Sequence, residues 1–93
     1  MTSRVYRLAS AYALHNGDSH KGIAYLFNIE SGKVYKLNGV SYTMLASFDG
    51  KKTTEQILSE LLARYRAEPQ RIQADFKSLT ETWVNGRILE ERR

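Results

Sequence analysis

The 93-residue sequence contains no cysteine, a single proline and two histidines. The lack of cysteine excludes disulfides, thiolate metal sites, thiol nucleophiles and iron–sulfur ligation by cysteine, and it fits a reducing compartment. No apolar run approaches the roughly 20 residues that span a bilayer, and the first residues lack the apolar core of a signal peptide. We therefore expect a soluble, cytoplasmic protein without a membrane partner.

The composition is that of an ordinary globular domain. Hydrophobic residues make up 42% and charged residues 26% of the chain, which gives no sign of disorder. A chain of this length builds one modest core, so we predict a single domain over residues 1–93. The net charge of +4 leaves a nucleic acid or an acidic peptide open as a partner.

Residues 23–38, IAYLFNIESGKVYKLN, predict two β-strands around a tight turn. Ile23, Tyr25 and Phe27 alternate as in a half-buried strand, and turn-forming residues follow at 30–32. The second strand, residues 33–37, has a lysine near each end. Lysine on a strand protects a free sheet edge from unwanted pairing, or keeps such an edge soluble until a partner arrives.

Before this hairpin, residues 4–14 read as one strand with a bend, and the polar residues 15–22 read as a loop with an Asn-Gly turn signal. The ranges that follow the hairpin read as helices. Asn38 can cap a helix that holds Val40, Met44, Leu45 and Phe48 and stops at Asp49-Gly50.

Two further helices have clear start signals. The run Thr53-Thr-Glu-Gln matches a capping box and opens a helix to about Arg66. A third helix starts at Glu68-Pro69, ends at Asn85-Gly86, and is followed by an apolar tail at residues 88–89 that should pack back onto the domain. Three strands followed by three helices predict an α+β fold, in which a three-stranded antiparallel sheet is covered on one face by helices in a winged-helix-like arrangement.

Motifs of catalysis are missing from the sequence. It has no GxSxG, no glycine-rich phosphate loop, no HExxH and no isolated carboxylate pair. His15 and His20 with Asp18 lack the remaining ligands of a closed metal site, so they read as solvated loop residues. We therefore expect no enzyme, no metal and no cofactor, and we interpret the strand aromatics as core residues that cover the sheet rather than a platform for nucleic-acid bases.

Several short motifs nevertheless occur in a specific order. They are a strand that ends in Leu37-Asn38, the run GVSYTMLASFDG with its aliphatic pair Met44-Leu45 and its closing Asp49-Gly50, the helix opening TTEQIL, the step Asp75-Phe76, and the end Gly86-Arg87-Ile88-Leu89. Over residues 23–89 the chain resembles the PqqD-like family, the RiPP recognition elements that bind leader peptides of ribosomally synthesised and modified peptides.

The resemblance implies a stand-alone recognition element, with the lasso-peptide type favoured. In that family the leader adds as an antiparallel strand to the third strand and lies in a groove closed by the third helix, a known mode of peptide binding. Carried over, the pairing backbone is Lys33, Val34, Tyr35, Lys36 and Leu37. The groove wall is Ile72, Asp75, Phe76, Leu79 and Thr82.

The implied partners are the leader of a precursor peptide and a leader peptidase or other maturation enzyme, such as a cyclase or a radical enzyme. The lysines of the pairing strand favour an acidic leader by electrostatic steering.

Two other readings stay open. One is a winged helix-turn-helix DNA-binding protein, which we regard as unlikely because the third helix mixes Asp75, Lys77 and Glu81 where a DNA-reading helix is mainly basic. The other is an adaptor that docks on an enzyme through a free sheet face and does not contact the substrate of that enzyme.

Overall fold

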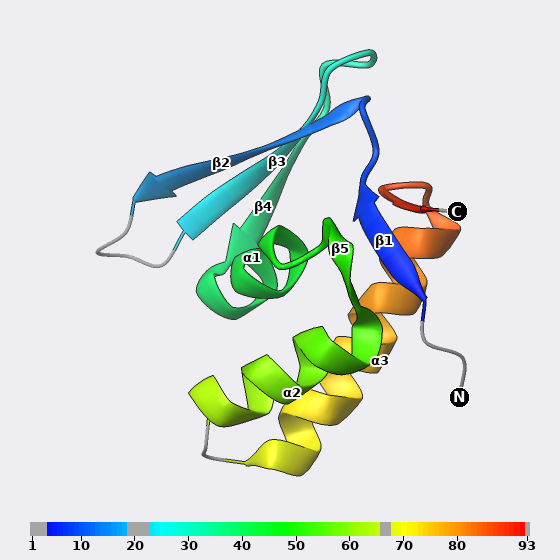
Figure 1. The fold of residues 1–93 in the computed structure, drawn as a ribbon. Coiled ribbons are helices and arrows are strands. Elements are labelled where there is room, and N and C mark those ends of the chain that lie inside the picture. Colours follow the sequence, from blue (N-terminus) through cyan, green and yellow to red (C-terminus); the bar gives the residue numbers. More distant parts are fainter. Residues whose placement is uncertain (1–3, 19–22, 66–67, 93) are drawn as a thin grey trace.

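The computed structural model describes residues 4–18, 23–65 and 68–92. Figure 1 shows β2, β3 and β4 at one end of the molecule, α2 at the other and α1 between them, while α3 runs from beside α2 toward the C-terminus next to β1. The elements are β1 (Val5–Leu8), β2 (Tyr12–Asp18), β3 (Ile23–Asn28), β4 (Val34–Asn38), α1 (Gly39–Ala46), β5 (Asp49–Thr53), α2 (Thr54–Arg64), α3 (Pro69–Asn85) and β6 (Leu89–Glu91).

The predicted α+β class with an antiparallel three-stranded sheet and three helices is confirmed, and this sheet has the order β2-β3-β4. A second three-stranded sheet, in the order β5-β1-β6, goes beyond the prediction. Strands and helices also alternate along the chain, because β5 lies between α1 and α2 and β6 follows α3.

The single strand predicted for residues 4–14 is wrong, because the segment divides between the two sheets. A tight turn, closed by a hydrogen bond of 3.0 Å from the Tyr12 amide to the Ala9 carbonyl, separates β1 from β2. Strand β2 then continues to Asp18, through the first half of the predicted loop. The second half of that loop, with His20, lies outside the described residues.

The predicted helix caps are present. The Asn38 side chain accepts a hydrogen bond of 2.8 Å from the Ser41 amide at the start of α1. Thr53 and Gln56 form the reciprocal capping box of α2. Pro69 occupies the first turn of α3, where its missing amide costs no hydrogen bond.

The predicted stop of the first helix at Asp49-Gly50 is wrong. Helix α1 ends at Ala46, and these two residues begin β5 instead. The Asp49 carboxylate accepts hydrogen bonds from the amides of Lys52 and Lys51, at 3.0 and 2.9 Å, and these bonds lower the pKa of Asp49. Asp49 therefore shapes the start of a strand rather than the end of a helix.

The core lies where the helices meet the inner faces of the two sheets. Its buried residues come from every helix and from β1, β3 and β6, and Leu89 confirms that the C-terminal tail packs back. They are Tyr6, Leu26, Met44, Leu45, Phe48, Ile57, Leu61, Phe76, Trp83 and Leu89. Among the described residues no helix is long and apolar enough to cross a membrane.

Candidate functional site

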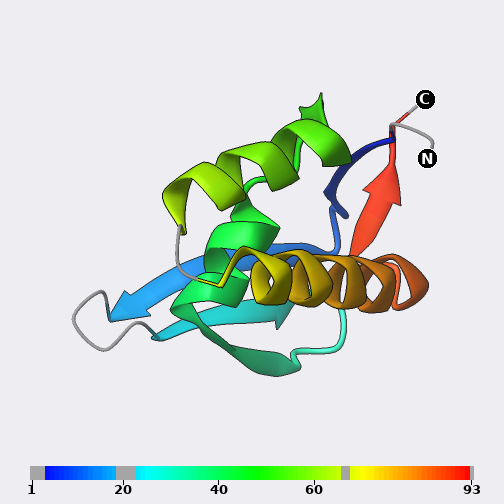
Figure 2. The ribbon, with the colours of Figure 1, turned by 90° about the horizontal axis from the view of Figure 1, so that it is seen from below.

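Strand β4 forms the edge of the β2-β3-β4 sheet, as the lysine pattern predicts. It pairs with β3 in an antiparallel register that runs from Phe27 opposite Val34 to Ile23 opposite Asn38. Among the described strands, none pairs with its other side. Strand β4 therefore presents an open edge, as do the other outer strands of the two described sheets, and its end leads directly into α1 (Figure 2).

The register determines which backbone groups of β4 point outward. The Asn28 amide donates a hydrogen bond of 2.8 Å to the Lys33 carbonyl at the turn. Because hydrogen-bonded and non-bonded pairs alternate along an antiparallel ladder, the backbones of Tyr35 and Leu37 also point toward β3. The amides and carbonyls of Val34 and Lys36 then point away from the sheet, toward the open edge.

The side chains of β4 alternate between the two faces of the sheet. Tyr35 lies opposite the buried Leu26, and Leu37 packs on the core, so both occupy the inner face that the helices share. Val34 and Lys36 occupy the outer face and are exposed. Tyr35 is 43% exposed although it lies on the inner face, which makes it an apolar contact surface at the rim of the edge.

A hollow of about 280 Å³ lies where the end of β4 meets α1 and α3. We call it the groove. Its apolar residues come from both helices, and polar side chains surround them. The lining residues are Asn38, Val40, Ser41, Met44, Glu68, Arg71, Ile72, Asp75 and Leu79.

One face of α3 supplies the wall of the groove. Ile72, Asp75 and Leu79 follow the helical repeat, and all three line the groove. Asp75 is exposed and lies 3.9 Å from the Arg71 guanidinium, which also contacts Glu68 at 3.5 Å. Thr82 continues the same face one turn later, where its hydroxyl donates to the Ser78 carbonyl at 3.0 Å.

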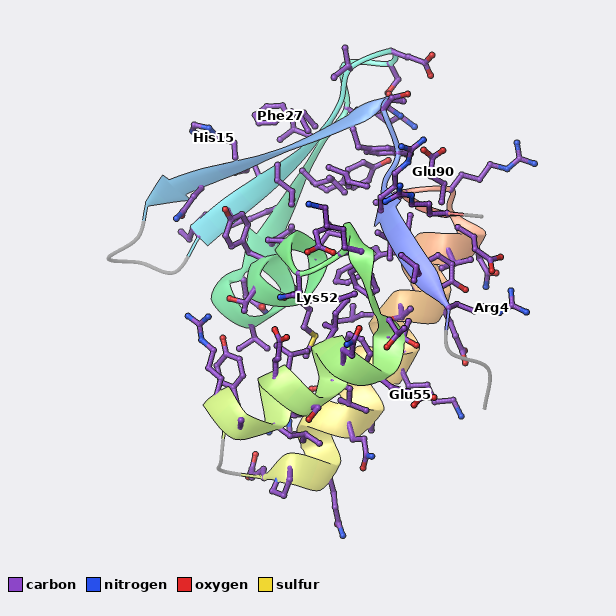
Figure 3. All side chains as sticks on the ribbon, viewed as in Figure 1. Arg4, His15, Phe27, Lys52, Glu55 and Glu90 are labelled. Carbon is purple, nitrogen blue, oxygen red and sulfur yellow. The ribbon has the colours of Figure 1, made fainter. Side chains whose placement is uncertain are left out.

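Of the five predicted wall residues, Thr82 is not among those that line the groove, and neither is Phe76. Its side chain is buried in the core, where its ring stacks on Phe48. It also lines a second hollow of about 410 Å³ on the other side of α3, between α2 and β1, to which Arg4 and Glu55 in Figure 3 contribute. Phe76 therefore holds α3 in place from behind the groove.

The sequence analysis did not assign the α1 side of the groove. Val40 and Met44 line it, but their spacing predicts only a helix face toward the core, and Met44 is indeed fully buried. Asn38 was identified as a cap, and it also borders the groove because the cap lies where β4 turns into α1. Their position at the groove becomes visible only once the places of α1 and α3 are known.

The described residues hold no cluster of three or more histidine, cysteine, aspartate or glutamate side chains that could bind a metal ion. The site thus consists of an open strand edge and a hollow whose lining is partly apolar and partly polar. Addition of an extended peptide to an open strand edge is a known mode of recognition.

Comparisons with known proteins agree with this geometry. The sequence model of the family Coenzyme PQQ synthesis protein D (PqqD) matches residues 24–89. A search of curated proteins gives no match.

Two solved structures share the fold. One is TbiB1 in complex with the TbiA(beta) leader peptide, with a TM-score of 0.73, 17% identity, and coverage of 94% of this chain and 98% of that chain. The other is the solution NMR structure of the PqqD truncation of Methylobacterium extorquens PqqCD, described as a functional, stand-alone RiPP recognition element. It has a TM-score of 0.69, 28% identity, and coverage of 92% of this chain and 88% of that chain. Because the family match extends from β3 to β6 and includes both the open edge and the groove, this protein belongs to the PqqD family.

Proposed function

We propose that this chain binds the leader region of a ribosomally synthesised precursor peptide by strand addition to β4 and delivers it to maturation enzymes. The observation that carries the proposal is the open edge of β4, where Val34 and Lys36 direct unpaired backbone groups outward beside the groove. The complex of the similar TbiB1 with a leader peptide supports it.

The proposed pairing uses the stretch Lys33 to Leu37. The outward amides and carbonyls of Val34 and Lys36 form the main-chain hydrogen bonds, which carry no sequence preference of their own. Selection comes from alternate leader side chains that reach the inner face. There they meet Tyr35 on the strand side and Ile72 and Leu79 on the helix side.

The charges around the edge favour an acidic leader. Lys33 and Lys36 are exposed on β4, so they attract carboxylates during encounter, over a Debye length of about 8 Å at physiological salt. Asp75 on the opposite wall has Arg71 as its partner, so this carboxylate repels an acidic peptide less than a free one would.

A recognition role without catalysis is part of the proposal. The chemistry then belongs to partner enzymes, a leader peptidase, a cyclase or a radical enzyme, and a lasso-peptide pathway is the setting that we favour. The stand-alone PqqD truncation is a functional recognition element without further domains, which supports this division of labour.

A titration of a fluorescently labelled leader peptide, taken from the precursor encoded beside this gene, tests the proposal. We expect saturable binding with one leader per chain and no binding of a duplex DNA of matched charge. Duplex binding that falls steeply with added salt, together with no binding of the leader, would instead establish the DNA-binding alternative.

A further inference from the structure

The outer face of the β2-β3-β4 sheet, on the side away from the helices, is apolar and largely aromatic. The strand register places Phe27 opposite Ala13 and Val34, and Tyr25 opposite His15 and Lys36. Opposite residues of an antiparallel pair point to the same side of the sheet. We call the following residues the outer face: Ala13, His15, Ile23, Tyr25, Phe27, Ile29, Val34 and Lys36.

Figure 3 shows His15 and Phe27 on the side of the strands opposite α1. Their rings meet edge to face with centroids 6.2 Å apart, and the Tyr25 ring lies 6.5 Å from Phe27. Ile29 extends the β2–β3 ladder through a 2.7 Å hydrogen bond from its amide to the Ala11 carbonyl. The aromatic rings thus form one continuous surface with Ile29 and Val34.

This surface contributes nothing to the core. No residue of the outer face belongs to the core cluster or to the residues packed against it, whereas Ala24 and Leu26, their neighbours on β3, are buried on the inner face. Ile29 is 65% and Val34 52% exposed. The interpretation of the strand aromatics as core residues is therefore wrong for Tyr25 and Phe27. In a domain this small, a contiguous apolar surface outside the core indicates a protein interface.

The outer face is continuous with the proposed leader site. A leader strand that pairs with β4 lies about 4.8 Å from β4, the usual spacing between neighbouring strands. Every second side chain of the leader then points to the outer face, beside Val34 and Lys36. A protein that covers this part of the sheet contacts the chain and the bound leader together.

The charges favour a different protein over a second copy of this chain. Each copy carries the cation Lys36 on its outer face, and the whole chain carries +4. Two copies joined face to face would bring these like charges together. A partner with an apolar patch and a carboxylate opposite Lys36 fits better.

We infer that the outer face, extended by the leader strand, is the docking surface of the maturation enzyme, which binds the leader-loaded chain more tightly than the free chain. The part of this inference that concerns tighter binding of the leader-loaded chain rests on the proposed function. The gain in enzyme affinity on loading equals the gain in leader affinity that the enzyme causes, because coupling between two ligands is reciprocal. A coupling of about tenfold lies within the usual range.

The experiment uses each purified modifying enzyme that is encoded beside the gene of this protein. Biolayer interferometry measures the affinity of the enzyme for the free chain and for the leader-saturated chain. The main variant combines Phe27→Thr with Ile29→Lys, which removes apolar outer-face surface and keeps strand-forming character in β3. Ser59→Lys on the exposed side of α2 is the control that adds the same charge elsewhere. Tyr25→Thr is the second variant should the double variant lose its thermal unfolding transition.

We expect one enzyme to bind the loaded chain about tenfold more tightly than the free chain. The outer-face variant should weaken that binding at least tenfold and bind the leader as the wild type does, and Ser59→Lys should change neither affinity. Equal enzyme binding by wild type and outer-face variant overturns the inference. It is also overturned if the wild type forms a dimer that the variant abolishes, or if none of the enzymes binds.

Failure of the proposed function gives a different result. If the wild type binds no leader, the docking surface is tested only by comparing the affinity of the enzyme for the free wild-type chain with its affinity for the free outer-face variant. A tenfold loss in the outer-face variant then still supports the docking surface, and no loss overturns it.

Discussion

The rings of Phe48 and Phe76 stack with their centroids 5.8 Å apart and their planes 1° from parallel. Phe48 follows α1 and Phe76 lies in the middle of α3, so this contact fixes the distance between the two helices that line the groove. Trp83 meets Phe48 edge to face at 6.5 Å and extends the cluster along α3.

Replacing Phe76 by alanine should lower the free energy of unfolding by about 3–5 kcal/mol, since it removes a buried ring and leaves a cavity. Urea unfolding followed by Trp83 fluorescence measures the loss. Ile29→Ala is the control, because a side chain that is 65% exposed should cost less than about 0.5 kcal/mol. A Phe76→Ala variant as stable as the control would show that the stack does not hold α1 against α3.

The position of Phe76 also shows what the helical repeat can and cannot predict. Ile72, Phe76, Leu79 and Trp83 recur at helical spacing and predict a single apolar face. That face is wide enough to contact two different environments, the core and the groove. Phe76 and Trp83 turn into the core, while Ile72 and Leu79 sit at its margin, in the groove. The spacing alone does not separate these two groups, because the difference depends on where α1 lies.

The second sheet escaped prediction for a different reason. Strand β5 has the sequence DGKKT, which lacks apolar alternation, and β6 has only three residues. Both pair with β1, so their strand conformation depends on backbone pairing with a segment far away in the sequence. The helix caps at Asn38 and Thr53 could be predicted from the sequence, because each cap depends on hydrogen bonds between residues three positions apart.

Asp49 should make the stability of the protein depend on pH in strongly acid solution. Hydrogen bonds from backbone amides lower its pKa below the ordinary value of 3.8. A carboxyl whose pKa is lower in the folded state stabilises the fold above its unfolded pKa and loses this effect as the pH falls through the folded value. We therefore expect Asp49→Asn to be less stable than wild type at neutral pH.

The difference between the two proteins should shrink as the pH falls below 3.8, and it should be lost once Asp49 is protonated in the folded protein as well. Thermal unfolding followed by circular dichroism at neutral and acid pH provides the comparison. A constant difference across this range would mean that the charge of Asp49 has no part in stabilising β5.

Leu79 and Leu58 form a matched pair for testing the groove. Both are partly buried and pack against the core, but Leu79 lines the groove and Leu58 lines the hollow on the other side of α3. Leu79→Ala should weaken leader binding about ten- to hundredfold, because burying a leucine contributes about 1.5–3 kcal/mol and 1.4 kcal/mol corresponds to a factor of ten.

Leu58→Ala should reduce stability in the same way and leave leader affinity within about twofold of wild type. Isothermal titration calorimetry at a temperature where both variants are folded measures the two affinities. Equal losses in both variants would place the leader elsewhere than in the groove.

The open edge of β4 is tested by proline, which removes an amide donor but is tolerated on the free side of an edge strand. Because the amides of Val34 and Lys36 point away from β3, Val34→Pro and Lys36→Pro should each retain a cooperative unfolding transition. Each should also weaken leader binding by at least about tenfold, since one main-chain hydrogen bond is lost and its partner on the leader remains unpaired.

Lys36→Ala separates the backbone from the side chain, because it keeps the amide and removes only the charge. Its effect should appear mainly in the association rate and should fade as salt is added, whereas the loss in Lys36→Pro should persist at high salt. Stopped-flow fluorescence with a labelled leader at two salt concentrations distinguishes the two variants. A folded Lys36→Pro variant that binds the leader as tightly as Lys36→Ala would show that the leader does not pair with this edge.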